Sequence, residues 1–133
     1  MDKEERKRKD RIRQQKNREK KRKYVMEYKE RSCCAVCGVC NALIMDFHHI
    51  DSKYNSVSRI VNNNNSLETL KKEINKCVTI CGNCHRCLHM DNDFYKNSDI
   101  KHLKGKVIEP FEAIAYGRIK ISKYWEQKCF KKR

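Results

Sequence analysis

The sequence predicts a small α+β domain that a metal ion holds together, between two basic flanks. The chain has 133 residues, of which 37% are charged and only 38% hydrophobic. It can therefore bury only a small core and needs a further source of stability. Nine cysteines could supply it, and their Cys-x-x-Cys spacing favours thiolate–metal binding by reduced cysteines over disulfides. Short β-prone segments alternate with segments of helical spacing, which indicates mixed secondary structure.

Residues 32–100 are expected to form the folded unit. Strands are predicted over 42–48 and over 77–80, because both segments are short and β-prone. A helix is predicted over 66–74, where a serine can cap the first turn and three apolar side chains share one face. The polar segment before this helix contains four consecutive asparagines and predicts a loop. A last helix is expected to begin near residue 83 and to carry two histidines.

Both flanks are strongly basic, whereas the central unit is neutral. The net charge of +15 divides into +8 for residues 1–31, zero for 32–100 and +7 for 101–133. Such a distribution suits a polyanion such as DNA or RNA, whose phosphates release counterions on binding. Residues 101–133 are expected to form a basic C-terminal extension with a helix around 111–119.

The N-terminal flank is predicted to be one long polar helix over 3–31, since no Gly or Pro interrupts good helix formers. One interpretation is a solvated charged tail. The other is an arm that contacts phosphates, because 12 of the 18 residues from Arg6 to Lys23 are Lys or Arg. These candidate nucleic-acid contacts are Arg6, Lys7, Arg8, Lys9, Arg11, Arg13, Lys16, Arg18, Lys20, Lys21, Arg22 and Lys23.

Each of two cysteine clusters contains two overlapping Cys-x-x-Cys pairs, 34/37 or 37/40 and 81/84 or 84/87. Gly38 and Gly82 favour the first pair in each cluster, because such turns often need a residue with positive φ. The expected ligands of a closed, tetrahedral structural Zn²⁺ site are Cys34, Cys37, Cys81 and Cys84. Buried free cysteines or a redox pair are the alternative. The remaining cysteines, expected to be small apolar or reactive surface residues, are Cys33, Cys40, Cys77, Cys87 and Cys129.

Four histidines predict a second, open metal site. His85 and His89 are four residues apart on the expected helix, so both rings project from one face. His48 and His49 are neighbours on an expected strand and therefore point to opposite faces. One of them can join the helical pair on a divalent ion, and the other can accept a proton from water. The alternative is that His85 and His89 complete a Cys₂His₂ zinc site, which would leave the first cysteine pair unexplained.

Three motifs occur together: Cys34-x-x-Cys37-Gly38, then Asp46-Phe47-His48-His49-Ile50-Asp51, then Lys76-Cys77-x-x-Ile80-Cys81-x-Asn83-Cys84-His85-x-x-x-His89. Over roughly residues 33–92 the chain thus resembles the HNH endonucleases with a zinc-stapled ββα-metal core. The resemblance implies that His48, His85 and His89 hold the catalytic ion and that His49 is the general base. It also implies DNA cleavage that leaves 5′-phosphate and 3′-hydroxyl ends.

The chain departs from the family at the asparagine that orients the general base. The equivalent position is Lys76, five residues before the first cysteine of the second cluster. Asn75 could serve after a small shift, one of residues 62–65 could, or a backbone carbonyl could orient His49.

The expected function is therefore metal-dependent hydrolysis of DNA phosphodiesters, by nicking or by cutting both strands. The alternative is a non-catalytic, zinc-dependent nucleic-acid-binding module, and RNA is the less favoured substrate. Mg²⁺ or Mn²⁺ is the expected catalytic ion, although histidine ligands also accept Ni²⁺ and Zn²⁺. A linear product from a plasmid would suggest a homodimer or paired nicks. The sequence has no apolar leader and no membrane span, which predicts an intracellular protein, and its Lys-, Asn- and Ile-rich composition suggests a virus or mobile element as its source.

Overall fold

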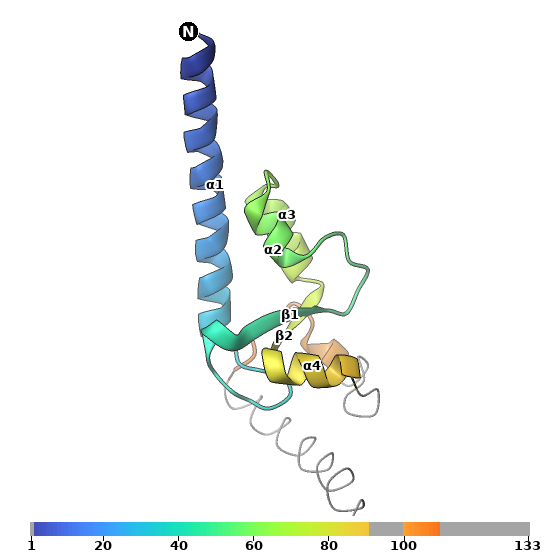
Figure 1. Cartoon of the computed structure of the whole chain (residues 1–133). Helices are drawn as coiled ribbons and strands as arrows, with labels where there is room; N and C mark the ends of the chain where they lie inside the picture. Colours follow the sequence, from blue (N-terminus) through green and yellow to red (C-terminus); the bar gives the residue numbers. More distant parts are fainter. Residues whose placement is uncertain (1, 91–99, 110–133) are drawn as a thin grey trace, which may run out of the picture.

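The computed structural model describes residues 2–90 and 100–109. Its elements are, in chain order, α1 (Lys3–Arg31), η1 (Ala42–Ile44), β1 (Met45–His49), α2 (Val57–Asn62), α3 (Leu67–Ile74), β2 (Cys77–Cys81), α4 (Gly82–Met90) and η2 (Lys101–Leu103). The two-stranded sheet lies between the α2–α3 pair and α4, and α1 runs alongside (Figure 1). This arrangement confirms the predicted small α+β fold.

The two strands form an antiparallel pair in which Met45 faces Cys81 and His49 faces Cys77. All five residues of β2 are buried, so β2 is the central element although the sheet has only two strands. Since a two-stranded sheet is barely stable alone in water, the helices and loops packed on it must supply the burial.

Two apolar clusters pack on this sheet. The first joins β2 and α4 to the cysteine loop through residues such as Val36, Met45 and Ile80. Ile108, from the segment after η2, is fully buried in the same cluster, so the start of the expected C-terminal extension packs on the core. The second cluster joins α1, α2 and α3 through residues that include Tyr28.

Helix α1 divides into an exposed half and a docked half. Residues 3–13 are all exposed, and this end of the helix projects beyond the α2–α3 pair (Figure 1). Further along, Tyr24, Val25 and Tyr28 pack into the second cluster. Burial raises the pKa of the Tyr28 hydroxyl to about 12, with the neighbouring Tyr24 adding to the effect, so the hydroxyl stays neutral. The helix therefore belongs to the domain at its C-terminal end and is an arm at its N-terminal end.

Lys21 fastens the docked half. Its side chain is fully buried, and its ammonium donates hydrogen bonds to the backbone carbonyls of Ile60, at 2.6 Å, and Asn63, at 2.7 Å. These carbonyls lie at the C-terminal end of α2, where backbone acceptors have no partner within the helix and where a cation is favoured. Burial lowers the pKa of Lys21, and the nearby Arg18 lowers it further.

Several local expectations differ from the structure. Residues 42–44 form a 3₁₀ turn rather than the start of β1, because the Asn41 side chain caps it by accepting a hydrogen bond from the Leu43 N–H. The expected loop before α3 contains α2, which Ser56 caps in the same way and which buries Ile60. The expected helix around 111–119, together with Cys129, lies outside the described residues. No helix within 2–90 and 100–109 has the length and apolar character needed to cross a membrane.

We expect Lys21→Met to lower the free energy of unfolding by about 1–3 kcal/mol, because the methionine fills the space but leaves two carbonyls without their donor. Lys20→Met, at the neighbouring exposed position, should change it by less than about 0.5 kcal/mol. Urea unfolding followed by circular dichroism measures both. Equal stability of the two variants would contradict the anchoring role of Lys21.

Candidate metal centres and catalytic cleft

Four cysteine sulfurs converge where the first cysteine loop meets the junction of β2 and α4. The sulfurs of Cys34, Cys37, Cys81 and Cys84 all lie within 4.8 Å of one another. Those of Cys37 and Cys81 are 3.7 Å apart, and a tetrahedron with Zn–S bonds of 2.3 Å has edges of about 3.8 Å. The donor set and its spacing thus fit a closed structural site for a metal such as zinc, and they select the 34/37 and 81/84 pairs.

The backbone around these sulfurs explains the spacing. The N–H groups of Val36 and Cys37 donate to the Cys34 sulfur, and that of Cys84 donates to the Cys81 sulfur, each at 3.4 Å. Gly38 closes the first turn with φ of 79°, as its position predicts. Gly82 is different, because it begins α4 and has no positive φ. In the second cluster the start of a helix supplies the turn.

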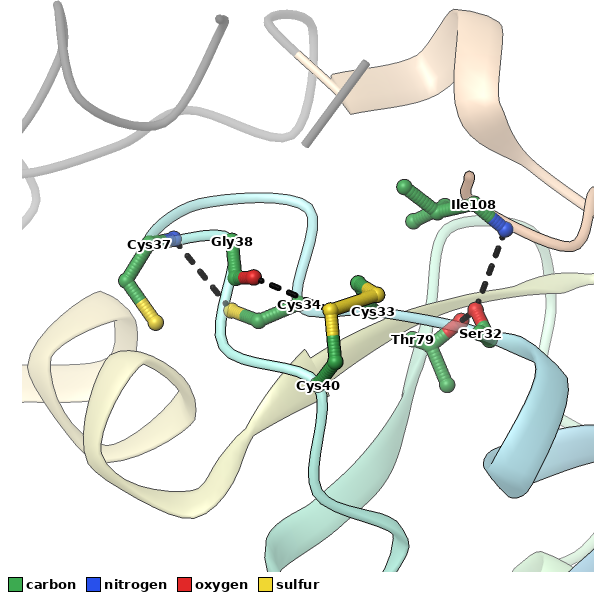
Figure 2. Close-up of a disulfide and its surroundings, with 8 residues drawn as sticks. All are labelled: Ser32, Cys33, Cys34, Cys37, Gly38, Cys40, Thr79 and Ile108. Atoms are coloured by element: carbon green, nitrogen blue, oxygen red, sulfur yellow. Dashed lines mark hydrogen bonds between the residues drawn. A yellow bond between two sulfur atoms is a disulfide. The ribbon is translucent and has the colours of Figure 1, made fainter. Parts of the chain in front are cut away.

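A disulfide between Cys33 and Cys40 closes the first cysteine loop. The expectation of reduced, unpaired cysteines at these two positions is therefore wrong. Figure 2 shows the disulfide at the base of the loop, with the side chains of Cys34 and Cys37 directed away from it. The bond joins the two ends of the segment that carries two of the four sulfurs, and it removes Cys40 from the alternative 37/40 pair.

Cys77 and Cys87, which belong to neither pair, remain free thiols. Cys77 is buried, and burial together with the nearby Glu73 raises its pKa to about 12, so it behaves as a small apolar side chain.

The four clustered thiols influence one another's ionisation. A hydrogen bond from Cys37 is the main reason that the pKa of the Cys34 thiol is lowered, with Cys81 adding to it. The opposite holds for Cys84, whose pKa is raised chiefly by its hydrogen bond to the Cys34 sulfur. A zinc ion needs thiolates, so binding here must release the protons that these sulfurs share.

We expect Cys81→Ser to lose the structural metal and to be largely unfolded at 25 °C, because metal binding to such sites contributes roughly 10 kcal/mol of folding free energy. Loading with Co²⁺ distinguishes the two metal centres, since only a thiolate site gives strong sulfur-to-cobalt charge-transfer absorption. Cys87→Ser is the matched control, since Cys87 lies outside the cluster, and should keep both the absorption and the fold. A folded Cys81→Ser protein would contradict a structural role for the cluster.

Three histidines form a second convergent group. Nitrogens of His48, on β1, and of His85 and His89, on α4, all lie within 4.8 Å of one another. The Nε2 atoms of His85 and His89 are 3.0 Å apart, close enough for both to bind one ion with metal–nitrogen bonds of about 2.1 Å. His48 is 7% exposed, whereas His89 is exposed, so the group opens to solvent on one side. An ion held here by three nitrogens could take a further ligand such as water from the open side.

Asp46 orients the central histidine of this group. Its carboxylate lies 3.3 Å from Nδ1 of His85, which leaves Nε2 turned toward the other rings. A carboxylate on the outer nitrogen of a metal-binding imidazole fixes the ring and increases its basicity. Asp46 and His48 are two residues apart on β1 and therefore share one face of the strand, which explains why both meet α4.

His49 lies on the other side of β1 and has a different partner. Its Nε2 is 2.9 Å from the Oε1 atom of Glu73, which is on α3. A carboxylate can only accept hydrogen bonds, so Nε2 carries the proton and Nδ1 keeps the lone pair. His49 and His85 both line a cleft of about 600 Å³. The ring is thus fixed in the tautomer that can act as a base, beside the histidine group.

Burial and hydrogen bonds also hold the Glu73 side chain in place. Its side chain is 2% exposed. The Tyr54 N–H donates to Oε1 at 2.9 Å, and the Lys76 ammonium donates to Oε2 at 3.1 Å. Burial alone would raise the pKa of the carboxyl, but these hydrogen bonds and the one from His49 outweigh it, so the pKa lies below its usual value. Glu73 is therefore ionised near neutral pH.

Glu73, which holds the His49 ring, is not among the residues that the sequence suggested for this role. Asn75, the expected candidate, ends α3 as its C-cap and is exposed. Asn62 and Asn63 instead lie at the end of α2, near α1. Lys76, which occupies the family's asparagine position, supports Glu73 through its salt bridge. A Glu and a Lys three residues apart are usually partners in a surface salt bridge, so no local signal distinguished this pair, in which Lys76 follows the end of α3.

The candidate nucleic-acid contacts along α1 fall into two groups. Lys21 is buried and bonded to backbone carbonyls, so its proposed phosphate contact is wrong. The remaining positions are exposed or partly exposed. The Arg22 guanidinium also donates a hydrogen bond to the side-chain oxygen of Asn62, at the end of α2, at 3.3 Å.

Comparison with protein-family models, with curated proteins and with solved structures finds no match to this chain. Any functional conclusion must therefore come from the geometry of the two centres and the cleft.

The lowered pKa of Glu73 predicts a pH dependence of stability. A carboxyl whose pKa is depressed in the folded protein stabilises it above the unfolded pKa of about 4.3 and loses that contribution as the pH falls further. We expect Glu73→Gln to be less stable than wild type by about 1–3 kcal/mol at pH 7 and this difference to shrink below pH 4.5. Denaturant unfolding at pH 7 and at a pH below 4.5 measures this difference in stability. Glu68→Gln, at an exposed position, is the control. A difference that stays constant with pH would contradict the ionised state of Glu73.

Proposed function

We propose that this protein is a metal-dependent DNA endonuclease of the HNH type. The observation that carries the proposal is the placement of His49, whose ring is oriented by a buried carboxylate at 2.9 Å and shares a cleft with His85 of the three-histidine group. A purely structural zinc module needs neither an oriented imidazole nor a second metal centre that is open to solvent.

His49 and the three-histidine group have separate roles in the proposed hydrolysis. His49 accepts, at Nδ1, a proton from the water whose oxygen attacks the phosphorus. The bond from phosphorus to the 3′-oxygen then breaks, and that oxygen leaves as a hydroxyl after taking a proton from solvent. A divalent ion bound by His48, His85 and His89 would stabilise the negative charge that develops on the phosphate oxygens.

Glu73 acts through His49 and is a positioning residue. It keeps the proton on Nε2, and its negative charge favours the imidazolium that forms when Nδ1 accepts a proton. The role that the family gives to an asparagine is thus assigned here to a carboxylate from α3.

A nucleic acid is the proposed substrate because the charge of the described surface favours a polyanion, and the resemblance to the HNH endonucleases favours DNA over RNA. The exposed half of α1 carries closely spaced cations, and such a surface binds phosphates without reading sequence. Binding should therefore weaken steeply as salt is added. A competition between duplex DNA and duplex RNA of equal length would identify the preferred polymer.

We expect wild type to nick a supercoiled plasmid with at least one of Mg²⁺, Mn²⁺, Ni²⁺ or Zn²⁺, and His49→Ala to be slower by about 100-fold or more. Glu73→Gln should lie between them, since it weakens the orientation of the base without removing it. His102→Ala is the control histidine variant, because it lies outside the three-histidine group. Before the assay, each variant is checked to have the same content of thiolate-bound metal and the same circular dichroism spectrum as wild type.

Two results would overturn this assignment. Cleavage by His49→Ala at the wild-type rate would remove His49 as the base. DNA binding without cleavage under all four ions would instead favour the non-catalytic zinc module.

A further inference from the structure

The cleft beside His49 has a second wall that the proposed mechanism does not use. On one side it is lined by β1, by α2 and by the segment before α2, and on the other by four residues of α1. These four residues are Arg22, Val25, Met26 and Lys29. Their spacing of i, i+3, i+4 and i+7 defines a single face of a helix. Helix α1 therefore presents one continuous stripe to the cleft.

This stripe is apolar in its middle and cationic at both ends. Opposite it, Phe47, Val57 and Val61 continue the apolar lining. Lys53, on the wall opposite α1, is a third cation of the lining in addition to Arg22 and Lys29. The cleft thus combines an apolar interior with positive charge at its edge, a combination that matches a nucleotide, whose base has apolar faces and whose phosphate is an anion.

Lys29 is the cation closest to the catalytic residues along the stripe. Its ammonium lies 5.4 Å from the centre of the Phe47 ring, and Phe47 is two residues before His49 on the same face of β1. Burial lowers the pKa of Lys29, and Asp46 offsets only part of this effect. A cation that has lost part of its hydration attracts an anion more strongly than one in bulk water.

Among the residues that the structure describes, Asp46 is the only carboxylate that lines the cleft. It pairs with His85 and also acts on Lys29, so it balances only part of the positive charge. One carboxylate therefore faces three cations in the described lining, and a phosphate would complete the charge balance.

The size of the cleft limits what can enter. About 600 Å³ is within the range of small-molecule sites and is far too small for a duplex. A nucleotide that is unstacked from its neighbours can enter, as it does in enzymes that extrude a base from the helix.

We propose that the cleft between α1 and the β1–α2 wall binds one unstacked nucleotide of the substrate strand, next to the phosphate that is cut. Lys29 and Arg22 hold its phosphates, and the apolar lining takes its base. This inference rests on the proposed nuclease function for its biological meaning, but nucleotide binding in the cleft can be measured without cleavage.

The test uses the full chain with one equivalent of zinc and no other divalent ion, and the oligonucleotides are checked to be intact after the measurement. Binding of fluorescent tetrathymidylate is compared with binding of a tetramer that has the same backbone but no bases. We expect wild type to prefer tetrathymidylate by about tenfold, because stacking and burial of a base contribute at the scale of 1–3 kcal/mol per base. Equal binding of the two tetramers would overturn the proposal, since charge alone would then explain the affinity.

Lys29→Met should weaken tetrathymidylate binding by about tenfold. Lys72→Met, at an exposed position of α3 outside the cleft, should weaken it by about twofold or less. If Lys29→Met lowers the thermal stability, Lys53→Met replaces it, because Lys53 is exposed and lies on the opposite wall. Equal losses in cleft and control variants would overturn the proposal.

A cleavage experiment separates this inference from the nuclease assignment. Oligonucleotide duplexes with and without one unpaired thymidine are cut under single-turnover conditions with saturating protein. Faster cutting of the unpaired substrate, lost in Lys29→Met and kept in Lys72→Met, supports the proposal. If the protein cuts both duplexes equally, the cleft proposal fails while the nuclease stands. If no substrate is cut but tetrathymidylate still binds through Lys29, the nuclease assignment fails while the cleft proposal stands.

Discussion

The four-cysteine cluster is the constraint on which the rest of the structure depends. It ties the loop at 34–37 to the point where β2 ends and α4 begins. Two strands alone would be marginal in water, and α4 has only nine residues, too few to be a stable helix by itself. A metal ion bound at this junction would fix the direction of α4 relative to β1. Because Cys84 lies on the same helix as His85 and His89, the cluster together with the packing of Leu88 sets where these histidines lie relative to His48.

The predictable part of the site is the part set by local periodicity. Alternation along a strand separates His48 from His49, and a spacing of four residues on a helix brings His85 and His89 together, whatever surrounds them. The Cys-x-x-Cys turns are local in the same sense, and so is Ser66, which caps α3 as predicted. These features depend on residues within about one helical turn, which a single sequence displays directly.

The features that the sequence did not reveal depend on partners far along the chain. Glu73 meets His49 across 24 residues, and Lys21 meets Ile60 across 39 residues. In both cases a charged residue on a helix would ordinarily be exposed, and only the tertiary fold places it in the interior beside polar groups. The Cys33–Cys40 pair was missed for another reason. The Cys-x-x-Cys spacing favoured reduced cysteines, and Cys33 and Cys40 were expected to be small apolar or reactive surface residues, whereas the fold joins them to close the loop.

Helix α1 has two neighbouring faces, one that packs on the domain and one that lines the cleft. The stripe that contains Lys21, Tyr24, Val25 and Tyr28 faces the domain, and the stripe from Arg22 to Lys29 lies one position further around the helix and faces the cleft. A tail that only aids solubility needs neither the apolar triplet Tyr24-Val25-Met26 nor a buried lysine. Because the first stripe fixes the rotation of α1 about its axis, it also determines which cations of the second stripe reach the cleft. The anchoring of α1 by Lys21 and the cationic edge of the cleft are therefore physically linked, although the hydrogen bonds of the Lys21 ammonium go to Ile60 and Asn63, which do not line the cleft.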